Sequence, residues 1–253
     1  MYTDTHCHIF SSDYENIDII LKKLKPDNIK RIIINGFDYK SNNEVIKLIN
    51  KYKNVYGALG IHPNNIKDYN EKTINHIINN INHPKIIAIG EIGLDYFRNN
   101  NNKSNQKSLL ISLLNIAKDY NKPVIIHNRQ STDDLLKILK EYKTKGIIHS
   151  FSGSYETAIE FIKLDYKLGI NGILTFKNSK LNEVLNKIPI NNILLETDSP
   201  YITPEPHRGK QNEPKYINYI AKKLSKIYNL SETELSCHLE KNFHSLFDIG
   251  ARK

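Results

Sequence analysis

The sequence predicts an α/β fold, a single (β/α)8 barrel that spans residues 1–253. Short β-branched runs alternate with amphipathic segments from one end of the chain to the other. This alternation gives eight strand–helix units at intervals of roughly 25 to 35 residues, and about 250 residues is the usual size of such a barrel. No proline- or serine-rich linker interrupts the pattern, which favours one domain.

Most of the predicted strands are near-continuous apolar runs, as expected for parallel strands that are buried on both faces. They are Tyr2–Thr5, Arg31–Ile34, Val55–Gly60, Ile86–Gly90, Pro123–Ile126, Gly146–Ile148, Tyr166–Ile170 and Asn192–Leu195. An open doubly wound sheet would share this alternation. It is the weaker interpretation, because no glycine-rich phosphate-binding loop follows any of these runs.

Between the strands, apolar residues recur at the i, i+3, i+4, i+7 spacing of a helix face. The predicted helices are Ile17–Leu24, Val45–Ile49, Ile74–Ile81, Leu110–Ala117, Leu135–Tyr142, Ala158–Ile162, Leu181–Ile188, Tyr216–Tyr228 and Glu232–Phe247. The stretch Arg98–Gln106 is dominated by Asn, so we expect a surface loop there.

Composition excludes several classes of protein. Hydrophobic residues make up 39% of the chain, which excludes a disordered protein. No apolar run reaches the length of about 18 residues that a membrane span needs. Met1 leads directly into a polar segment, and Cys7 and Cys237 are too few for a disulfide framework. These features predict a cytoplasmic protein without a membrane partner.

The chain is basic, with 36 Lys and Arg residues against 27 Asp and Glu residues and a net charge of +9. Such a charge suits a polyanionic partner. The lysines are scattered, however, and the whole chain is biased toward Lys, Asn and Ile. The charge therefore permits nucleic-acid binding without demanding it.

Polar residues collect where the predicted strands end. They are Asp4, His6, His8, His62, Glu91, His127, His149 and Asp198. In a (β/α)8 barrel the carboxyl ends of all strands meet at one face, so residues distant in sequence converge there. Alternation along an extended segment also sends the side chains of His6 and His8 to the same side. We therefore expect one cluster of histidines and carboxylates.

This cluster has the composition of a divalent metal site. Four histidines and two carboxylates exceed what one tetrahedral ion needs, so we predict two ions (Mg, Mn or Zn) bound by His6, His8, Glu91, His127, His149 and Asp198. Such pairs lie about 3.5–4 Å apart and activate a hydroxide for hydrolysis. Glu91 is the candidate for the bridging ligand, and Asp198 for a ligand that also orients or deprotonates the attacking water.

Other chemistries explain the residues less well. Ser152 lacks the G-x-S-x-G context of a nucleophilic serine. Glycoside hydrolysis by Glu91 and Asp198 leaves four histidines without a role. Two carboxylates have structural alternatives. Asp4 could fix the tautomer of a neighbouring histidine, and Asp95 could cap a loop or helix.

Seven segments around these residues carry a resemblance to a known family. They are TDTHCHIF (3–10), GIHP (60–63), IGEIGLDY (89–96), PVIIHNR (123–129), GIIHSFSG (146–153), LLETDSPYITP (194–204) and RGKQNEP (208–214). In this order they resemble the motifs of the TatD family of metal-dependent deoxyribonucleases, within the amidohydrolase-like barrels. Departures such as Gln130, where the family often has an acidic residue, remove no ligand.

The resemblance implies which residues hold each ion. His6, His8, Glu91 and Asp198 would hold one ion, and Glu91, His127 and His149 the other. The resemblance also implies that His62 and Arg129 contact phosphate. It places Arg208 and Asn212 in a signature loop after the last strand, where we expect both to contact the substrate. Arg129 could instead pair with Asp133, and unpaired bases could stack on Tyr201 or Phe151.

The leading hypothesis is a monomeric deoxyribonuclease that hydrolyses phosphodiester bonds of single-stranded DNA or DNA 3′ ends, in the 3′ to 5′ direction. The alternative is a D-aminoacyl-tRNA deacylase, or another ester or amide hydrolase, on the same metal site. A third reading is a basic nucleic-acid-binding module whose histidines are structural. It leaves the ligand-type residues at the strand ends unexplained.

Overall fold

The computed structural model describes residues 1–98 and 100–249 and confirms the predicted barrel. Eight parallel strands lie side by side in chain order, which is not the order of a doubly wound sheet. They are β1 (Tyr2–Cys7), β2 (Ile29–Asn35), β3 (Val55–Leu59), β4 (Ile86–Asp95), β5 (Val124–Arg129), β6 (Gly146–Ile148), β7 (Tyr166–Ile170) and β8 (Ile193–Leu195).

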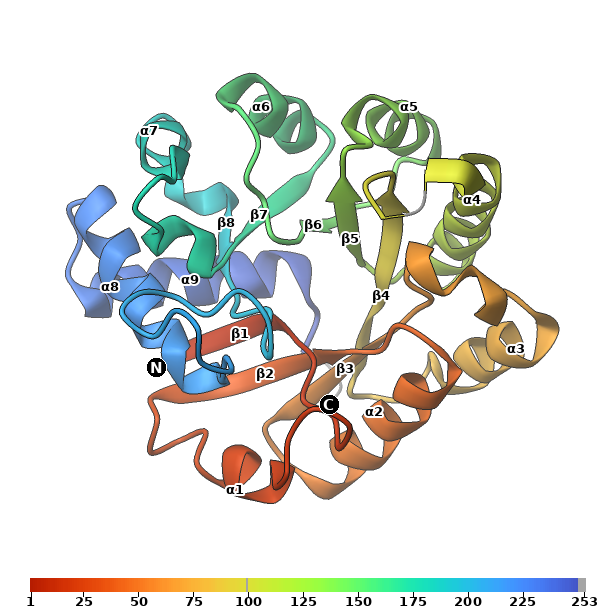
Figure 1. Ribbon diagram of the computed structural model, residues 1–253, viewed down its shortest axis with the longest axis horizontal. Coiled ribbons are helices and arrows are strands. Elements are labelled where there is room, and N and C mark those ends of the chain that lie inside the picture. Colours follow the sequence, from red (N-terminus) through yellow and green to blue (C-terminus); the bar gives the residue numbers. More distant parts are fainter. Residues whose placement is uncertain (99, 250–253) are drawn as a thin grey trace.

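Side-chain and loop contacts join the first strand to the last. The Thr5 hydroxyl of β1 donates a hydrogen bond to the Leu195 carbonyl of β8, at 3.0 Å. Just beyond, the Asp198 amide donates to the His6 carbonyl at 2.9 Å. The strands therefore form a nearly closed barrel, and its helices form an outer ring (Figure 1).

An α-helix follows each of these eight strands, and a second one follows the last. They are α1 (Ile17–Lys22), α2 (Tyr39–Lys51), α3 (Glu71–Asn80), α4 (Lys103–Asp119), α5 (Thr132–Tyr142), α6 (Tyr155–Lys163), α7 (Leu181–Leu185), α8 (Ile217–Ile227) and α9 (Glu232–Leu246). None of the described helices is long and apolar enough to cross a membrane.

Several boundaries differ from the sequence expectation, mostly because elements extend beyond their apolar runs, as α2 does by beginning at Tyr39 rather than Val45. The predicted loop Arg98–Gln106 is wrong in its second half, because α4 begins at Lys103, and Asn99 lies outside the described residues. The buried Gln106 side chain accepts a hydrogen bond from the Asp95 amide at 2.8 Å and donates one to the Asp95 carbonyl at 3.0 Å. These tertiary contacts hold the first turn of α4 despite its asparagines.

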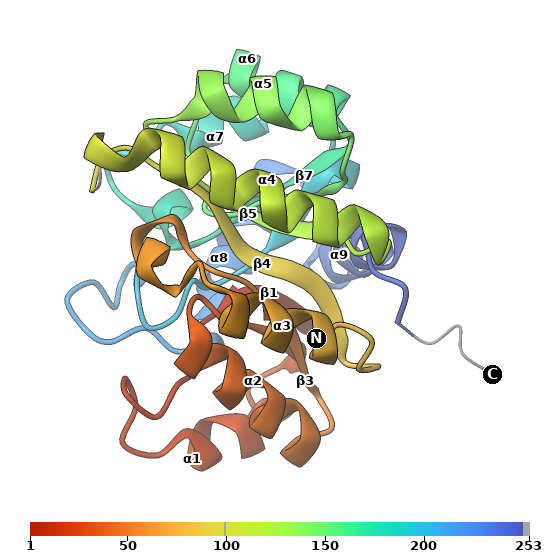
Figure 2. The same cartoon turned by 90° about the vertical axis from the view of Figure 1, so that its right-hand side faces the viewer.

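The helix α9 closes the amino end of the barrel, opposite the loop that follows β8 (Figure 2). Its Phe243, Leu246 and Phe247 pack with inward-facing strand residues such as Ile33 and Leu194. This end of the interior is therefore an apolar core. The carboxyl end, where β4 continues five residues beyond its predicted end at Gly90, carries the polar residues.

Candidate metal centre

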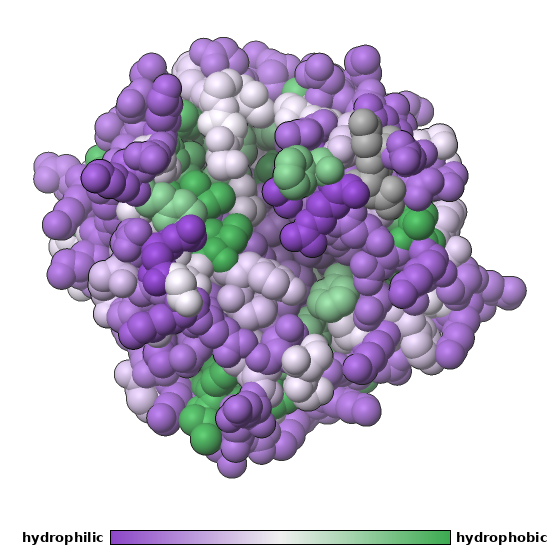
Figure 3. Space-filling model, in the orientation of Figure 1, coloured by the Kyte–Doolittle hydropathy of each residue, from purple (hydrophilic) through white to green (hydrophobic). Residues whose placement is uncertain are grey.

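The six predicted metal ligands come together at the carboxyl end of the barrel. They are His6 in β1, His8 just after it, Glu91 in β4, His127 in β5, His149 after β6 and Asp198 after β8. The corresponding face of the molecule is hollowed near its centre, and hydrophilic side chains surround the hollow (Figure 3). The cluster thus has the location of the active site in other (β/α)8 barrels.

Local structure explains how Asp198 reaches the histidines of β1. Asp198 adopts a left-handed backbone conformation (φ 58°), which Asp tolerates better than most residues. The His8 amide donates a hydrogen bond to the Ser199 carbonyl at 2.6 Å. Asp4 accepts hydrogen bonds from the Thr197 amide at 2.9 Å and the Thr197 hydroxyl at 2.5 Å. These contacts fasten the segment after β8 to β1.

This arrangement corrects one expectation for Asp4. Its carboxylate is fully buried and contacts the backbone amide of His6 at 3.3 Å rather than a histidine ring. Asp4 therefore positions the loop that carries Asp198, and the interpretation that it fixes a ring tautomer is wrong.

A first group of donor atoms consists of His6 Nε2, His8 Nε2, Glu91 Oε2 and Asp198 Oδ1. The two nitrogens are 3.0 Å apart. Glu91 Oε2 lies 3.6 Å from His6 and 3.4 Å from His8, and Asp198 Oδ1 lies 3.5 Å and 3.7 Å from them. Donors about 2.1 Å from a tetrahedrally bound ion are about 3.4 Å from one another. The group therefore fits a divalent cation.

A second group uses the other oxygen of Glu91. Oε1 lies 2.9 Å from His127 Nδ1 and 3.0 Å from His149 Nε2, and these two nitrogens are 3.4 Å apart. Gly93 in β4 allows the close approach of β5 on this side, because a Cβ there would lie 2.0 Å from the His127 carbonyl oxygen. Glu91 thus presents one oxygen to each group, as a bridging ligand would.

Three of the four histidines have a partner on the ring nitrogen that faces away from the cluster. His8 Nδ1 lies 2.9 Å from the Asn35 carbonyl. His127 Nε2 lies 3.2 Å from Asp95 Oδ2, and His149 Nδ1 lies 3.4 Å from Glu196 Oε1. Such partners orient ligand histidines. Asp95 also caps the turn after β4, because its Oδ1 accepts from the amides of residues 97 and 98.

Sequence reasoning missed Glu196. Its position two residues before Asp198 was the available signal, because a carboxylate in a fully buried strand end needs a partner. The structure gives it two contacts, a hydrogen bond from the Ser150 amide at 2.6 Å and His149 Nδ1 at 3.4 Å.

Burial and mutual contacts shape the protonation of the cluster. Burial lowers the pKa of the His6 imidazole well below its ordinary value, and it lowers that of His62 to about 3. Burial opposes ionisation of Glu91, but the surrounding imidazoles, His149 first, hold its pKa well below the usual range. Burial raises the pKa of Asp198 to about 6. The ionised Glu91 among imidazoles thus favours a cation between its oxygens and the rings.

Three of the predicted substrate contacts lie at the cluster or its mouth. His62 accepts from the Asn64 amide at Nδ1 (3.1 Å), so its Nε2 carries the proton and faces Glu91 Oε1 at 3.6 Å. The Tyr201 side chain is 55% exposed and its ring centroid lies 6.1 Å from that of His8. The exposed Arg129 stacks its guanidinium 3.9 Å from the centroid of Phe97.

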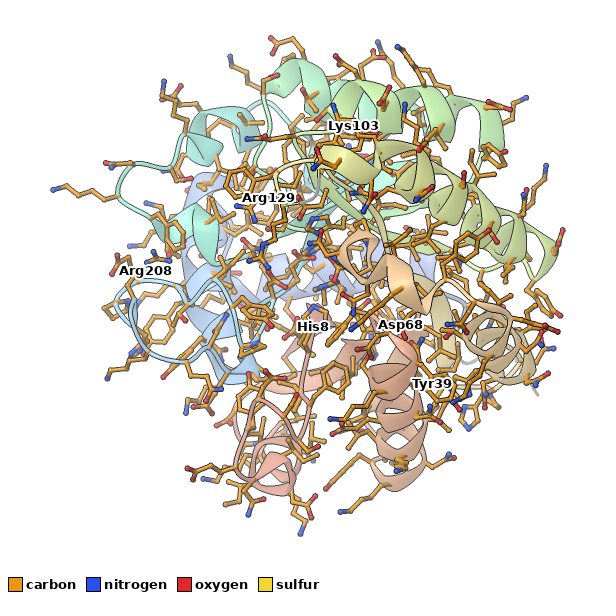
Figure 4. All side chains as sticks on the ribbon, turned by 45° about the vertical axis from the view of Figure 1, so that its right-hand side comes forward. His8, Tyr39, Asp68, Lys103, Arg129 and Arg208 are labelled. Carbon is orange, nitrogen blue, oxygen red and sulfur yellow. The ribbon has the colours of Figure 1, made fainter. Side chains whose placement is uncertain are left out.

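The other predicted contacts lie elsewhere. Arg129 makes no ion pair with Asp133 in the described part of the chain, and Phe151 is buried, so neither alternative holds. Asn212 is fully buried and donates to the carbonyls of residues 197 and 201 at 2.8 and 2.5 Å, so the expected substrate contact by this residue is wrong. Arg208 stacks on Phe176 at 3.9 Å, at the edge of the molecule and away from His8 (Figure 4).

Comparison with known proteins agrees with this geometry. Residues 3–248 match the family model described as TatD related DNase. The chain is 37% identical to the metal-dependent hydrolase YabD of Bacillus subtilis, over 99% of this chain and 100% of that protein.

Solved structures show the same fold. The TatD homologue YjjV from Escherichia coli K12 superposes with a TM-score of 0.92 at 30% identity, over 98% of each chain. A hydrolase of the TatD family from Entamoeba histolytica superposes with a TM-score of 0.85 at 26% identity, again over 98% of each chain. The chain with this histidine and carboxylate cluster therefore belongs to the TatD-related family of metal-dependent hydrolases.

Proposed function

We propose that this hydrolase cleaves phosphodiester bonds of single-stranded DNA, starting from the 3′ end, with two divalent ions (Mg, Mn or Zn) at the cluster. The observation that carries the proposal is the division of the Glu91 carboxylate between two donor groups. Bound ions would polarise the phosphoryl group and promote ionisation of the attacking water. All of the donors come from one chain, so we propose that the enzyme acts as a monomer built as one domain.

Two side chains of the site would move a proton and bind the phosphate. Asp198 would accept the proton of the attacking water, because its carboxylate is buried at the first donor group, beside His6 and His8. His62 would donate its Nε2 proton to a phosphate oxygen, since Nδ1 is already an acceptor. His62 faces Glu91 Oε1, whereas Asp198 lies beside His6 and His8 in the other donor group, so the two residues would act at different donor groups.

The mouth of the site suits an unpaired strand. Arg129 stacks on Phe97, whose side chain is 56% exposed, so the pair offers a cation for a phosphate and an apolar rim beside it. The Tyr201 ring offers a second exposed face near His8. Stacking on aromatic rings needs bases that are free of a partner strand. The net charge of +9 would attract DNA without selecting a sequence.

The experiment is an assay of a 5′-labelled single strand with Mg²⁺, Mn²⁺ or Zn²⁺, for the wild type and Glu91→Ala. We expect the wild type to give a ladder of products shortened from the 3′ end and Glu91→Ala to give none. Glu183→Ala, an exposed carboxylate on α7, is the matched control and should keep full activity.

Two results would overturn the proposal. A fully active Glu91→Ala variant would show that the bridging carboxylate is not needed. Hydrolysis of D-aminoacyl-tRNA by a wild type that leaves DNA intact would show that the same cluster serves a carbonyl ester.

A further inference from the structure

The Glu196 carboxylate occupies an unusual position at the end of β8. Its side chain is fully buried, and its Oε1 accepts a hydrogen bond from the Ser150 amide at 2.6 Å. Its Oε2 has no hydrogen-bond partner among the described residues. That oxygen lies against Gly169 of β7, where a Cβ would come within 2.2 Å of it. The absence of a side chain at Gly169 therefore leaves room for this carboxylate in the barrel interior.

A purely structural role does not account for Glu196. Burying an ionised carboxylate sacrifices its hydration, so its oxygens need partners that replace the lost water. In the described part of the chain no lysine or arginine forms an ion pair with Glu196, and its charged-group contact is His149 Nδ1 at 3.4 Å. Beyond its hydrogen bond with the Ser150 amide, Glu196 therefore acts on the neighbouring His149 ring.

The Glu196 carboxylate lies behind the His149 ring. Nδ1 is 3.4 Å from Glu196 Oε1, an ion-pair distance without a hydrogen bond, and Nε2 faces Glu91 Oε1 at 3.0 Å and His127 Nδ1 at 3.4 Å. His127 repeats the arrangement with its nitrogens exchanged, because Nε2 lies 3.2 Å from Asp95 and Nδ1 lies 2.9 Å from Glu91. Both histidines of the second group thus have a carboxylate behind them.

The first group lacks this support. His8 is held by the neutral backbone carbonyl of Asn35, and among the described residues His6 Nδ1 has neither a hydrogen-bond partner nor a carboxylate at ion-pair distance. Two buried carboxylates, Asp95 and Glu196, therefore place additional negative charge behind the second group alone. A carboxylate behind a ligand histidine fixes its tautomer and ring orientation and makes it a better donor.

We propose that Glu196 is a positioning residue which, together with Asp95, makes the group of Glu91, His127 and His149 the tighter of two metal positions. The proposal rests on the proposed function to the extent that the cluster holds two ions. It adds an order of filling, in which the second group binds its ion first and the first group, with Asp198, binds the more exchangeable one.

The test measures metal binding directly. Metal-free wild type and Glu196→Gln are titrated with Zn²⁺ against a chromophoric chelator. We expect two dissociation constants for the wild type, and a roughly 10- to 100-fold weakening of the tighter one alone in Glu196→Gln. Asp198→Asn is the matched variant for the other group and should weaken only the weaker constant. Thermal unfolding of each metal-free variant shows whether it is folded.

Asp95→Asn reports independently through His127 and should reproduce the selective loss, so the proposal does not depend on one variant folding. Unchanged constants in both variants, or equal weakening of both constants, would overturn it. A wild type that binds two Zn²⁺ ions as described but cleaves no DNA would overturn the proposed nuclease function and leave this assignment standing.

Discussion

The two ends of the barrel both bury charged groups, but they pair them differently. At the amino end the Arg31 guanidinium is 6% exposed, and it forms hydrogen bonds of 2.8 and 3.1 Å with the Glu240 carboxylate of α9. It also lies 4.6 Å from the ring centroid of Phe243. At the carboxyl end, His6 and His8 turn Nε2 atoms toward each other at 3.0 Å, with two carboxylates beside them.

The difference separates a structural pair from a binding site. A buried cation and anion that satisfy each other need nothing more, and removing one partner costs stability. At the carboxyl end, imidazole nitrogens and carboxylate oxygens instead point toward one another, and a bound metal cation would satisfy them together. We therefore expect substitutions at the carboxyl end to change chemistry and substitutions at the amino end to change stability.

The largest effect is expected for Asp198→Asn. It should lower kcat on single-stranded DNA by a factor of about 10² to 10⁴, the usual contribution of a positioned proton acceptor. A large decrease in the free energy of unfolding with unchanged kcat would contradict the comparison between the two ends.

The same variant should make the metal-free protein at least as stable at pH 7. Burial raises the pKa of Asp198 to about 6, above the ordinary value of 3.8. Between these two pH values the unfolded state loses the proton first, so the contribution of Asp198 to stability falls as the pH rises. Asn does not ionise. Urea unfolding should therefore show a fall in the free energy of unfolding from pH 4 to pH 7 in the metal-free wild type that is smaller in Asp198→Asn.

A smaller effect, on stability alone, is expected for Glu240→Gln. It should lower the free energy of unfolding by about 2 kcal/mol, because Arg31 loses its charged partner. Turnover of the folded enzyme should be unchanged. Glu183→Gln, an exposed carboxylate, serves as the control without effect.

The stability difference between the wild type and Glu240→Gln should decrease as the pH falls. Burial opposes ionisation of Glu240, but hydrogen bonds from Arg31 and Lys30 outweigh it and lower the pKa to about 2. The carboxylate therefore stabilises the fold above its ordinary value of 4.5, and this contribution is lost as the pH falls toward 2. Urea unfolding should show the gap between wild type and Glu240→Gln closing over that range. A gap that persists at pH 2 would contradict the assignment.

The sequence was sufficient to predict the barrel and the ligand cluster, because both depend on local patterns. Apolar runs predict the strands, and in this fold every strand end points to one face. The extension of β4 to Asp95 was not predictable in this way. It depends on Gly93 lying against the His127 carbonyl of the neighbouring strand, which is a tertiary contact.

The same reason explains the other differences. Asn212 and Phe151 were expected to reach substrate, but the paths of their loops bury them. Glu196 was not singled out, because its contacts are distant in the chain. The Ser150 amide, 46 residues away, donates to its Oε1, and the neighbouring His149 lies 3.4 Å from the same oxygen. Exposure and pairing between distant segments are properties of the folded chain.

The smallest effect is expected for Arg129→Ala, at the exposed rim of the carboxyl end. The side chain touches Phe97 and no described carboxylate, so its loss should leave the free energy of unfolding and kcat nearly unchanged. A lost phosphate contact should raise KM for single-stranded DNA by roughly three- to tenfold and reduce the slope of log KM against log salt by about one. Lys118→Ala removes the same charge at the exposed last turn of α4, which precedes the amino end of β5, and should change neither quantity. Equal effects of the two variants would mean that DNA responds to net charge alone, and that the rim has no particular role in binding.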